Sequence, residues 1–173
     1  MAILPIVTAP DPVLKKRAEP VVAVDASIQQ LMRDMLETMY AAPGIGLAAP
    51  QVGVSKRVIV VDVTYSEAAA QDGEPYCLAN PEIIAAEGEI TWEEGCLSVP
   101  ESYGKVDRKE HVVVRGLNAQ GELVTLEAHG LFAVCLQHEI DHLDGTLFID
   151  HLSSLKRTMI IKKLKKLKTE QAS

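Results

Sequence analysis

Cysteine, long apolar runs and repeats are scarce or missing in this chain, and each shortage excludes a class of protein. Three cysteines among 173 residues are too few for a disulfide framework, so we expect reduced thiols and a cytoplasmic protein. No stretch of about 18 apolar residues could span a membrane, and residues 1–10 lack the regions of a secretory signal. Because neither a repeat nor a low-complexity linker divides the chain, we expect one domain over residues 1–173.

Charge is distributed unevenly along the chain. The net charge is −7, yet residues 153–173 hold seven lysines and arginines and one glutamate, which leaves −13 on residues 1–152. An acidic body argues against DNA or general nucleic-acid binding, whereas a basic tail is able to dock on a polyanion.

Hydrophobic periodicity predicts helices at both ends of the chain and strands between them. Met32, Met35 and Met39 recur at helical spacing after Asp25, a good N-cap, and we interpret them as core residues. The pattern favours an α+β fold, with antiparallel or mixed sheets around a helix over 131–143. The expected elements are an extended proline-rich arm (3–22), a helix (26–41), a strand (57–63), a polar loop (65–75), short strands broken at Asn80-Pro81 and Glu87-Gly88 (76–91), a strand (105–117), a hairpin turn (118–121), a return strand (122–127), a helix (131–143) and a basic helix (153–168). The apolar face of the basic helix is expected to carry Leu155, Met159, Ile160, Leu164 and Leu167.

The clearest chemical signal is the pattern H-E-x-x-H at residues 138–142. On a helix, His138 and His142 lie one turn apart on the same face and are able to bind one metal ion. Glu139 is then placed to take a proton from a water molecule at that metal. The alternative is an ordinary helix that happens to carry two histidines.

A catalytic metal site of this kind needs about three protein ligands and one open position. The candidates for the third ligand are Cys96, Cys135, His111, His129 and His151. Cys135 lies in an apolar run and is expected to be buried. Cys96 follows a glycine in a segment that is neither clearly helix nor clearly strand, where an exposed functional thiol is expected. A competing hypothesis makes a cysteine the nucleophile and a histidine its base, but leaves Glu139 without a role.

Three segments together resemble the bacterial peptide deformylases. They are residues 44–51 (GIGLAAPQ), 94–98 (EGCLS) and 137–142 (QHEIDH), in the order and approximate spacing of that family. From composition alone the first segment favours a tight turn. The similarity extends over nearly the whole chain, and the lysine-rich last helix resembles that of the Gram-negative type.

The resemblance implies a hydrolase that removes the formyl group from the N-terminal formylmethionine of new proteins. Cys96, His138 and His142 would hold one divalent metal ion, Fe²⁺ natively and Zn²⁺, Ni²⁺ or Co²⁺ in some preparations. Glu139 would be the general base, and the Gln51 amide and Leu97 N–H would stabilise the oxyanion. The resemblance also implies substrate-binding roles for Gly46, Ile45, Trp92, Glu94, Leu131, Val134 and Cys135.

Other positions bear on this resemblance. Glu94 is expected to pair with Arg108, which matches a basic position that the family uses to brace this loop. Tyr103 stands where an arginine often contacts the substrate, and His129 replaces an acidic residue. Expected partners are formylmethionyl nascent peptides and, through the 153–168 helix, the ribosome, with no DNA and no membrane.

Two other functions fit parts of the same pattern. A metallopeptidase would use H-E-x-x-H to cleave unformylated peptides and would not need Cys96. A non-catalytic relative would keep the metal only for stability and would place no demand on Glu139 or Gln51.

Overall fold

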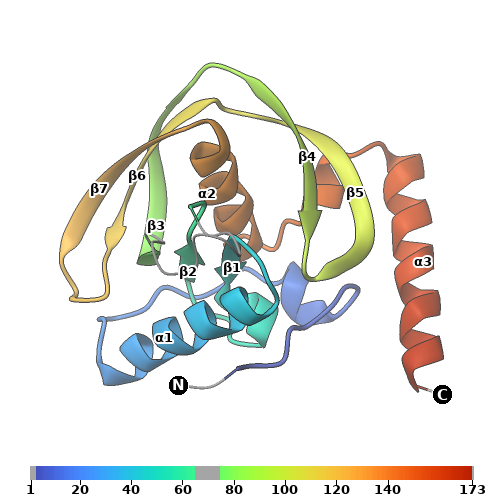
Figure 1. The fold of residues 1–173 in the computed structure, drawn as a ribbon, viewed down its shortest axis with the longest axis horizontal. Coiled ribbons are helices and arrows are strands. Elements are labelled where there is room, and N and C mark those ends of the chain that lie inside the picture. Colours follow the sequence, from blue (N-terminus) through green and yellow to red (C-terminus); the bar gives the residue numbers. More distant parts are fainter. Residues whose placement is uncertain (1–2, 65–74, 173) are drawn as a thin grey trace.

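The computed structural model describes residues 3–64 and 75–172. Within them, most strands follow one another, with helices before and after them, as expected for an α+β protein (Figure 1). The predicted loop at 65–75 lies, apart from its last residue, outside the described residues. The elements are η1 (Pro12–Lys15), α1 (Ala26–Ala41), β1 (Gly46–Ala48), η2 (Ala49–Val52), β2 (Val58–Val61), β3 (Tyr76–Glu87), β4 (Ile90–Cys96), β5 (Val99–Arg108), β6 (His111–Leu117), β7 (Leu123–His129), α2 (Gly130–Leu143), η3 (Phe148–His151) and α3 (Ser154–Ala172).

Helix α2 lies between two antiparallel sheets. One sheet has the strand order β1-β2-β3-β6-β7, and the other is the β4–β5 hairpin. Figure 1 shows α2 in the middle, with the five-stranded sheet on one side and the hairpin on the other. Leu136, Ile140 and Leu143 of α2 pack into one core cluster with Ile59 and Val112 of the larger sheet. The prediction of a central helix surrounded by strands is therefore confirmed.

Helix α1 begins and packs as its sequence predicts. The Asp25 carboxylate accepts a hydrogen bond of 3.0 Å from the Ile28 N–H, which caps the first turn. Met35 and Met39 are fully buried and belong to the same core cluster as Val58 of β2. The methionines are thus core residues, as predicted.

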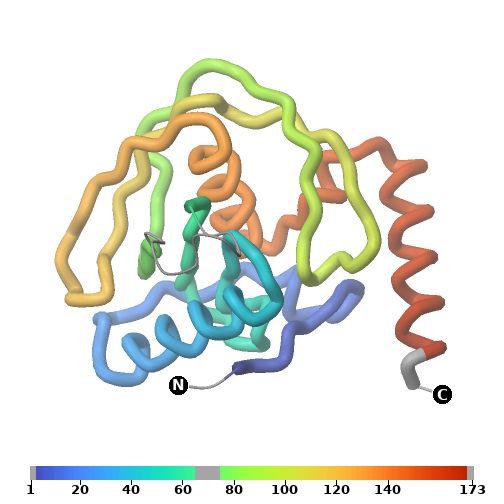
Figure 2. Tube along the Cα trace, in the orientation of Figure 1, coloured from blue at the N-terminus to red at the C-terminus, as the bar shows by residue number. Residues whose placement is uncertain are grey.

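The N-terminal arm is mostly extended and joins two segments that are distant in sequence. In Figure 2 it runs along the bottom of the view. The Val7 N–H donates to the Gln51 carbonyl at 2.7 Å, and the Ala9 N–H donates to the Ser98 carbonyl at 2.8 Å. Through these bonds, the arm connects residues 44–51 with the β4–β5 turn.

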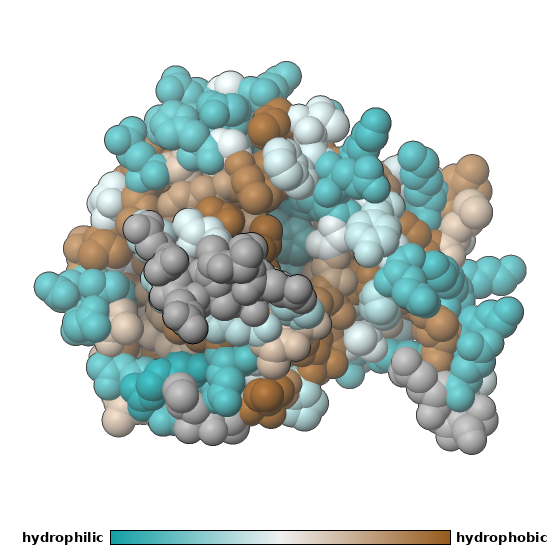
Figure 3. Space-filling model, viewed as in Figure 1, coloured by the Kyte–Doolittle hydropathy of each residue, from teal (hydrophilic) through white to brown (hydrophobic). Residues whose placement is uncertain are grey.

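Helix α3 packs against the outside of the hairpin with only part of the predicted apolar face. Leu164 is buried in a cluster with Val106 and Phe148, and Ile160 packs beside it. Leu155 and Met159 are instead 70% and 63% exposed, so the prediction that these two residues share the packing face is wrong. Figure 3 shows a largely hydrophilic surface on this helix, at the right of the view. Within the described residues, no helix combines the length and apolarity needed to cross a membrane.

Two predicted strand boundaries are wrong. The expected strand over 105–117 is two strands, because β5 ends at Arg108 and β6 starts at His111. The expected break at Asn80-Pro81 is a bulge within β3, where Asn80 adopts a φ of 51°. The Asn80 side chain bonds the N–H and carbonyl of Val21, so the bulge is held by the arm.

Candidate metal centre and active site

Cys96, His138 and His142 come together at one point. The two histidines lie one turn apart on α2, and Cys96 ends β4, so it lies in a strand and not in the irregular segment expected. One potential ligand atom from each residue lies within 4.8 Å of the others, and Cys96 Sγ is 3.3 Å from His142 Nε2. Among the described residues, this is the only cluster of three such side chains with this spacing.

The other candidates for the third ligand lie elsewhere. His111 and His129 stack on each other at the β6–β7 pair, with ring centroids 4.2 Å apart. His151 contacts Asp141, and Cys135 lines the nearby cavity. Burial raises the pKa of the Cys135 thiol well above its ordinary value, so this residue stays protonated.

The donor set of the triad fits a single divalent metal ion. One thiolate and two imidazoles are ligands that iron, zinc and cobalt accept, and three of them leave a fourth position open. Burial lowers the pKa of His142 well below its ordinary value, and His138 and Arg108 lower it further, so this imidazole is neutral and able to coordinate. Burial also lowers the pKa of His138, but Cys96 and Glu94 outweigh burial and raise it, and a cation in the triad would compete with this proton.

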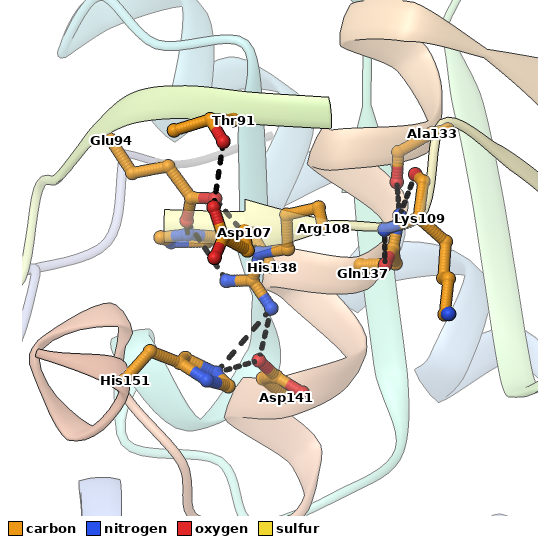
Figure 4. A network of polar contacts seen from close by, with 10 residues as sticks. All are labelled: Thr91, Glu94, Asp107, Arg108, Lys109, Ala133, Gln137, His138, Asp141 and His151. Atoms are coloured by element: carbon orange, nitrogen blue, oxygen red, sulfur yellow. Dashed lines mark hydrogen bonds and ion pairs between the residues drawn. The ribbon is translucent and has the colours of Figure 1, made fainter. Parts of the chain in front are cut away.

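Glu94 and Arg108 form a buried ion pair behind His138 (Figure 4). Arg108 donates to Glu94 through two nitrogens at 2.8 and 2.9 Å, which confirms the predicted pairing. Glu94 Oε1, which accepts one of these two bonds, is also 2.8 Å from His138 Nδ1, a contact that orients the ring and leaves Nε2 for a metal ion. Burial raises the pKa of Glu94, but hydrogen bonds from Arg108 and His138 outweigh burial and lower it to about 2.

Glu139 is buried beside the triad with an unpaired carboxylate oxygen. Its Oε1 atom is inaccessible and has no hydrogen-bond partner among the described residues. Burial raises the pKa of Glu139 to about 7, against the opposing effect of His138. A buried carboxylate oxygen without a partner is costly, and it marks a place where a proton donor is expected to bind.

Gly46 on β1 lies directly against Glu139. A Cβ at Gly46 would overlap the Glu139 carboxylate and would stand 3.1 Å from its Cγ. Only a residue without a side chain leaves this carboxylate in its position. The glycine of the first segment is thus needed for a close approach, and the segment is a short strand followed by η2, not a tight turn.

Gln51 and Leu97 both lie next to Cys96, the first in space and the second in sequence. The Gln51 side-chain oxygen accepts from the Ala48 N–H at 3.0 Å, and its Nε2 donates to Ser98 Oγ at 3.1 Å. The same Nε2 lies 3.4 Å from Cys96 Sγ. Leu97 occupies the two-residue turn between β4 and β5. Two kinds of hydrogen-bond donor, a side-chain amide and a backbone N–H in a tight turn, therefore flank the thiol.

A cavity of about 400 Å³ opens beside these residues. All seven predicted substrate-binding residues line it, as do Gln51, Cys96, Leu97, His138 and Glu139. Further lining residues were not predicted as site residues, namely Pro43, Gly44, Glu93, Gly95, Val99, Pro100, Glu101, Ser102 and Tyr103. Gly44 belongs to the first conspicuous segment and Gly95 to the second, but the β5 residues reach the cavity only because the hairpin folds back.

Comparison with known proteins agrees with this geometry. The sequence profile described as polypeptide deformylase matches residues 3–158. A peptide deformylase from Phenylobacterium zucineum is 56% identical over 167 residues, which cover 96% of this chain and 97% of that protein. One from Hydrogenovibrio crunogenus is 53% identical over 170 residues, 98% of each.

Solved structures agree as well. The peptide deformylase from Legionella pneumophila superposes with a TM-score of 0.89 at 48% identity and covers 99% of this chain and 98% of its own. That from Ehrlichia chaffeensis in complex with actinonin has a TM-score of 0.89 at 45% identity, with 96% and 98% covered. The chain belongs to the polypeptide deformylase family.

Proposed function

We propose that this protein hydrolyses the formyl group from the N-terminal formylmethionine of newly made proteins, with Cys96, His138 and His142 as the ligands of one divalent metal ion. The observation that carries the proposal is the buried Glu139 carboxylate, which lines the cavity together with Cys96 and His138 and has one oxygen without a partner among the described residues. The reaction consumes one water molecule and releases formate and a free α-amino group.

A divalent cation held by the triad would polarise the formyl carbonyl and lower the pKa of a water molecule in the site. Glu139 accepts a proton from the attacking water and returns it to the amine that leaves. A base with a pKa near 7 suits both steps, because it gains and loses a proton near neutral pH.

Gln51 and Leu97 are proposed to stabilise the oxygen of the formyl group as it gains negative charge. The Gln51 Nε2 atom has two protons, and the bond to Ser98 uses one of them. The second points toward Cys96 and is the donor for the oxyanion, together with the backbone N–H of Leu97. Removing one such donor typically lowers kcat by about 10²–10³.

The methionine side chain of the substrate is proposed to enter the apolar part of the cavity. Leu131, Val134 and Cys135 form one wall, because they lie on one face of α2. Ile45, directly before β1, and Trp92 of β4 also line the cavity. Gly46 lines the path of the substrate backbone, and Glu94 stays paired with Arg108 at the edge of the cavity.

Fe²⁺ is proposed as the metal ion in the cell, the cytoplasm as the place of action, and residues 1–173 as one catalytic domain. Protein purified without oxygen and loaded with Fe²⁺ or Ni²⁺ is expected to release formate from a formyl-Met tripeptide, and a chelator is expected to stop it. An acetylated peptide should remain intact. Cleavage of unformylated peptides without formate release would instead identify a metallopeptidase.

The Glu139→Gln variant separates catalysis from a purely structural metal site. It keeps the shape of the side chain but cannot move a proton, so turnover is expected to fall about 10²–10⁴-fold while one equivalent of metal stays bound. Unchanged turnover would remove Glu139 from the mechanism.

Helix α3 is proposed to dock on ribosomal RNA. Its lysines at 156, 162, 163, 165 and 166 are exposed, and a cluster of like charges favours a polyanion. Reversing Lys162 and Lys166 to glutamate should weaken binding to ribosomes at low salt. Equal binding by wild type and variant would contradict this role.

A further inference from the structure

A chain of polar contacts continues from the Glu94–Arg108 pair to a histidine outside the three motifs. Arg108 donates to Asp141 Oδ2 at 2.6 Å, in addition to its two bonds with Glu94. The same Asp141 oxygen is 2.9 Å from His151 Nε2. Figure 4 shows Glu94, Arg108, His138, Asp141 and His151 as one continuous network, with His151 at its outer end.

Exposure decreases along this chain toward the metal site. The side chains of His151 and Asp141 are 37% and 27% exposed, whereas those of Arg108 and Glu94 are each 4% exposed. The inner pair has almost no contact with water, so its orientation depends on protein groups alone. Asp141 holds the one guanidinium nitrogen of Arg108 that does not bond Glu94.

The segment that carries His151 also touches His138 from another side. Phe148, three residues earlier on η3, stacks on the His138 ring with centroids 6.3 Å apart and an interplanar angle of 23°. Phe148 and Ile149 are buried, which anchors η3 in the core formed with Val99 and Val106. The short helix η3 therefore contacts the His138 ring directly through Phe148, and it contacts the Glu94–Arg108 pair indirectly through His151 and Asp141.

We propose that His151 is a positioning residue for the metal centre, which acts through Asp141, Arg108 and Glu94 on the orientation of His138. The inference rests on the proposed role of His138 as a metal ligand. When His151 donates to Asp141, the carboxylate is held against Arg108. Without His151, the Asp141 carboxylate, which is 27% exposed, is free to turn toward water, and Arg108 and Glu94 lose their outer support.

The test measures how fast a chelator removes cobalt from the intact protein. Cobalt bound by a thiolate absorbs visible light, so the decrease in this absorbance after addition of excess EDTA measures the release of the metal ion. Partners directly behind a metal ligand typically contribute 10–100-fold to metal affinity, and His151 is further away. We therefore expect His151→Phe to release cobalt roughly 3–10-fold faster, whereas His151→Gln, whose amide is able to donate to Asp141, should stay near the wild-type rate.

A double variant tests whether His151 and Asp141 act along one path. Asp141→Asn should accelerate release about tenfold, and adding His151→Phe should change little more, because groups in one network are not additive. His129→Phe is the matched control. The His129 side chain is also exposed, at 65%, and lies 3.6 Å from one carboxylate, that of Glu110, but no hydrogen bond or ion pair among the described residues links it to Arg108. This control should release cobalt at the wild-type rate.

Two results would overturn the inference. One is a wild-type release rate in His151→Phe with an unchanged cobalt spectrum, even where the melting temperature falls, because that pattern describes a purely structural contact. The other is a double variant whose effect equals the product of the single effects. A wild-type protein that binds cobalt but releases no formate would contradict the proposed function, while the release rates would still decide the role of His151.

Discussion

Replacing Gly46 with alanine tests whether the position of Glu139 controls catalysis. The new Cβ would stand 3.0 Å from Cδ and 3.1 Å from Cγ of Glu139, closer than ordinary van der Waals contact, and would overlap the carboxylate. Strand β1 is held by β2 and packs against α2, so the backbone has little room to retreat. The Glu139 side chain must therefore move, by about 1 Å.

The expected effect on activity is much larger than the effect on stability. Overpacking costs about 1–3 kcal/mol, and alanine recovers about 0.5–1 kcal/mol relative to glycine in a strand. A net loss of at most about 2–3 kcal/mol leaves a domain of typical stability folded. A misplacement of about 1 Å at a catalytic group, in contrast, lowers the rate about 100-fold.

The assay follows formate release, with kcat and KM measured separately, and urea unfolding of the same preparations. Gly116→Ala is the matched control, because its Cβ would stand 3.1 Å from the Ala79 carbonyl oxygen and 3.3 Å from the Pro81 Cα of β3, and none of these residues lines the cavity. We expect similar stability losses but a large drop in kcat for Gly46→Ala alone. A kcat within about threefold of wild type, or equal drops in both variants, would refute the reasoning.

Two further predictions concern buried ionisable groups. Arg108→Met leaves the Glu94 carboxylate buried without its partner, so the free energy of unfolding of the metal-free protein should fall by about 3–5 kcal/mol, whereas Arg108→Lys, which keeps the charge but not the two-pronged geometry, should lose less. Equal urea midpoints for both variants and wild type would contradict this. Burial raises the pKa of Cys77 from 9.0 to about 11, so the unfolded chain ionises first and stability is lost as pH rises from about 9 to 11. Under reducing conditions, the free energy of unfolding of Cys77→Val should fall by about 2–3 kcal/mol less than that of wild type as pH rises over that range. Equal losses in the two proteins would contradict this prediction.

Local sequence signals predicted the elements whose causes are local. Asp25 and the methionine spacing located α1, and residues 118–121 located the β6–β7 turn. The break between β5 and β6 has a tertiary cause. The Gln137 side chain bonds both the N–H and the carbonyl of Lys109, at 2.9 and 2.8 Å, and so takes this residue out of the strand. Neither glycine nor proline marks that point, so the sequence pattern runs through it.

The candidate site was predictable to the extent that it lies in three short segments. Helical spacing alone brings His138, Glu139 and His142 together, but it left five candidates for the third ligand. Cys96 was preferred because it follows a glycine in a segment without a clear pattern, and because three segments resemble one family. The fold places it against the histidines. Phe148 contacts His138, and His151 contacts Asp141, so both support the site through residues of the preceding helix, α2. No local pattern marks such contacts, and His151 was considered only as a possible ligand.

The arrangement also explains why one helix serves both the core and the chemistry. Helix α2 buries Leu136 and Leu143 on one side, so its other side is held in a place that water scarcely reaches. A charge there is costly unless it is compensated. Arg108 compensates Glu94, which in turn orients His138, whereas Glu139 keeps one oxygen without a partner among the residues that the structure describes. Burial penalises the charged form of Glu139 and thereby raises its pKa to about 7, which suits the proposed role of this carboxylate as a general base near neutral pH.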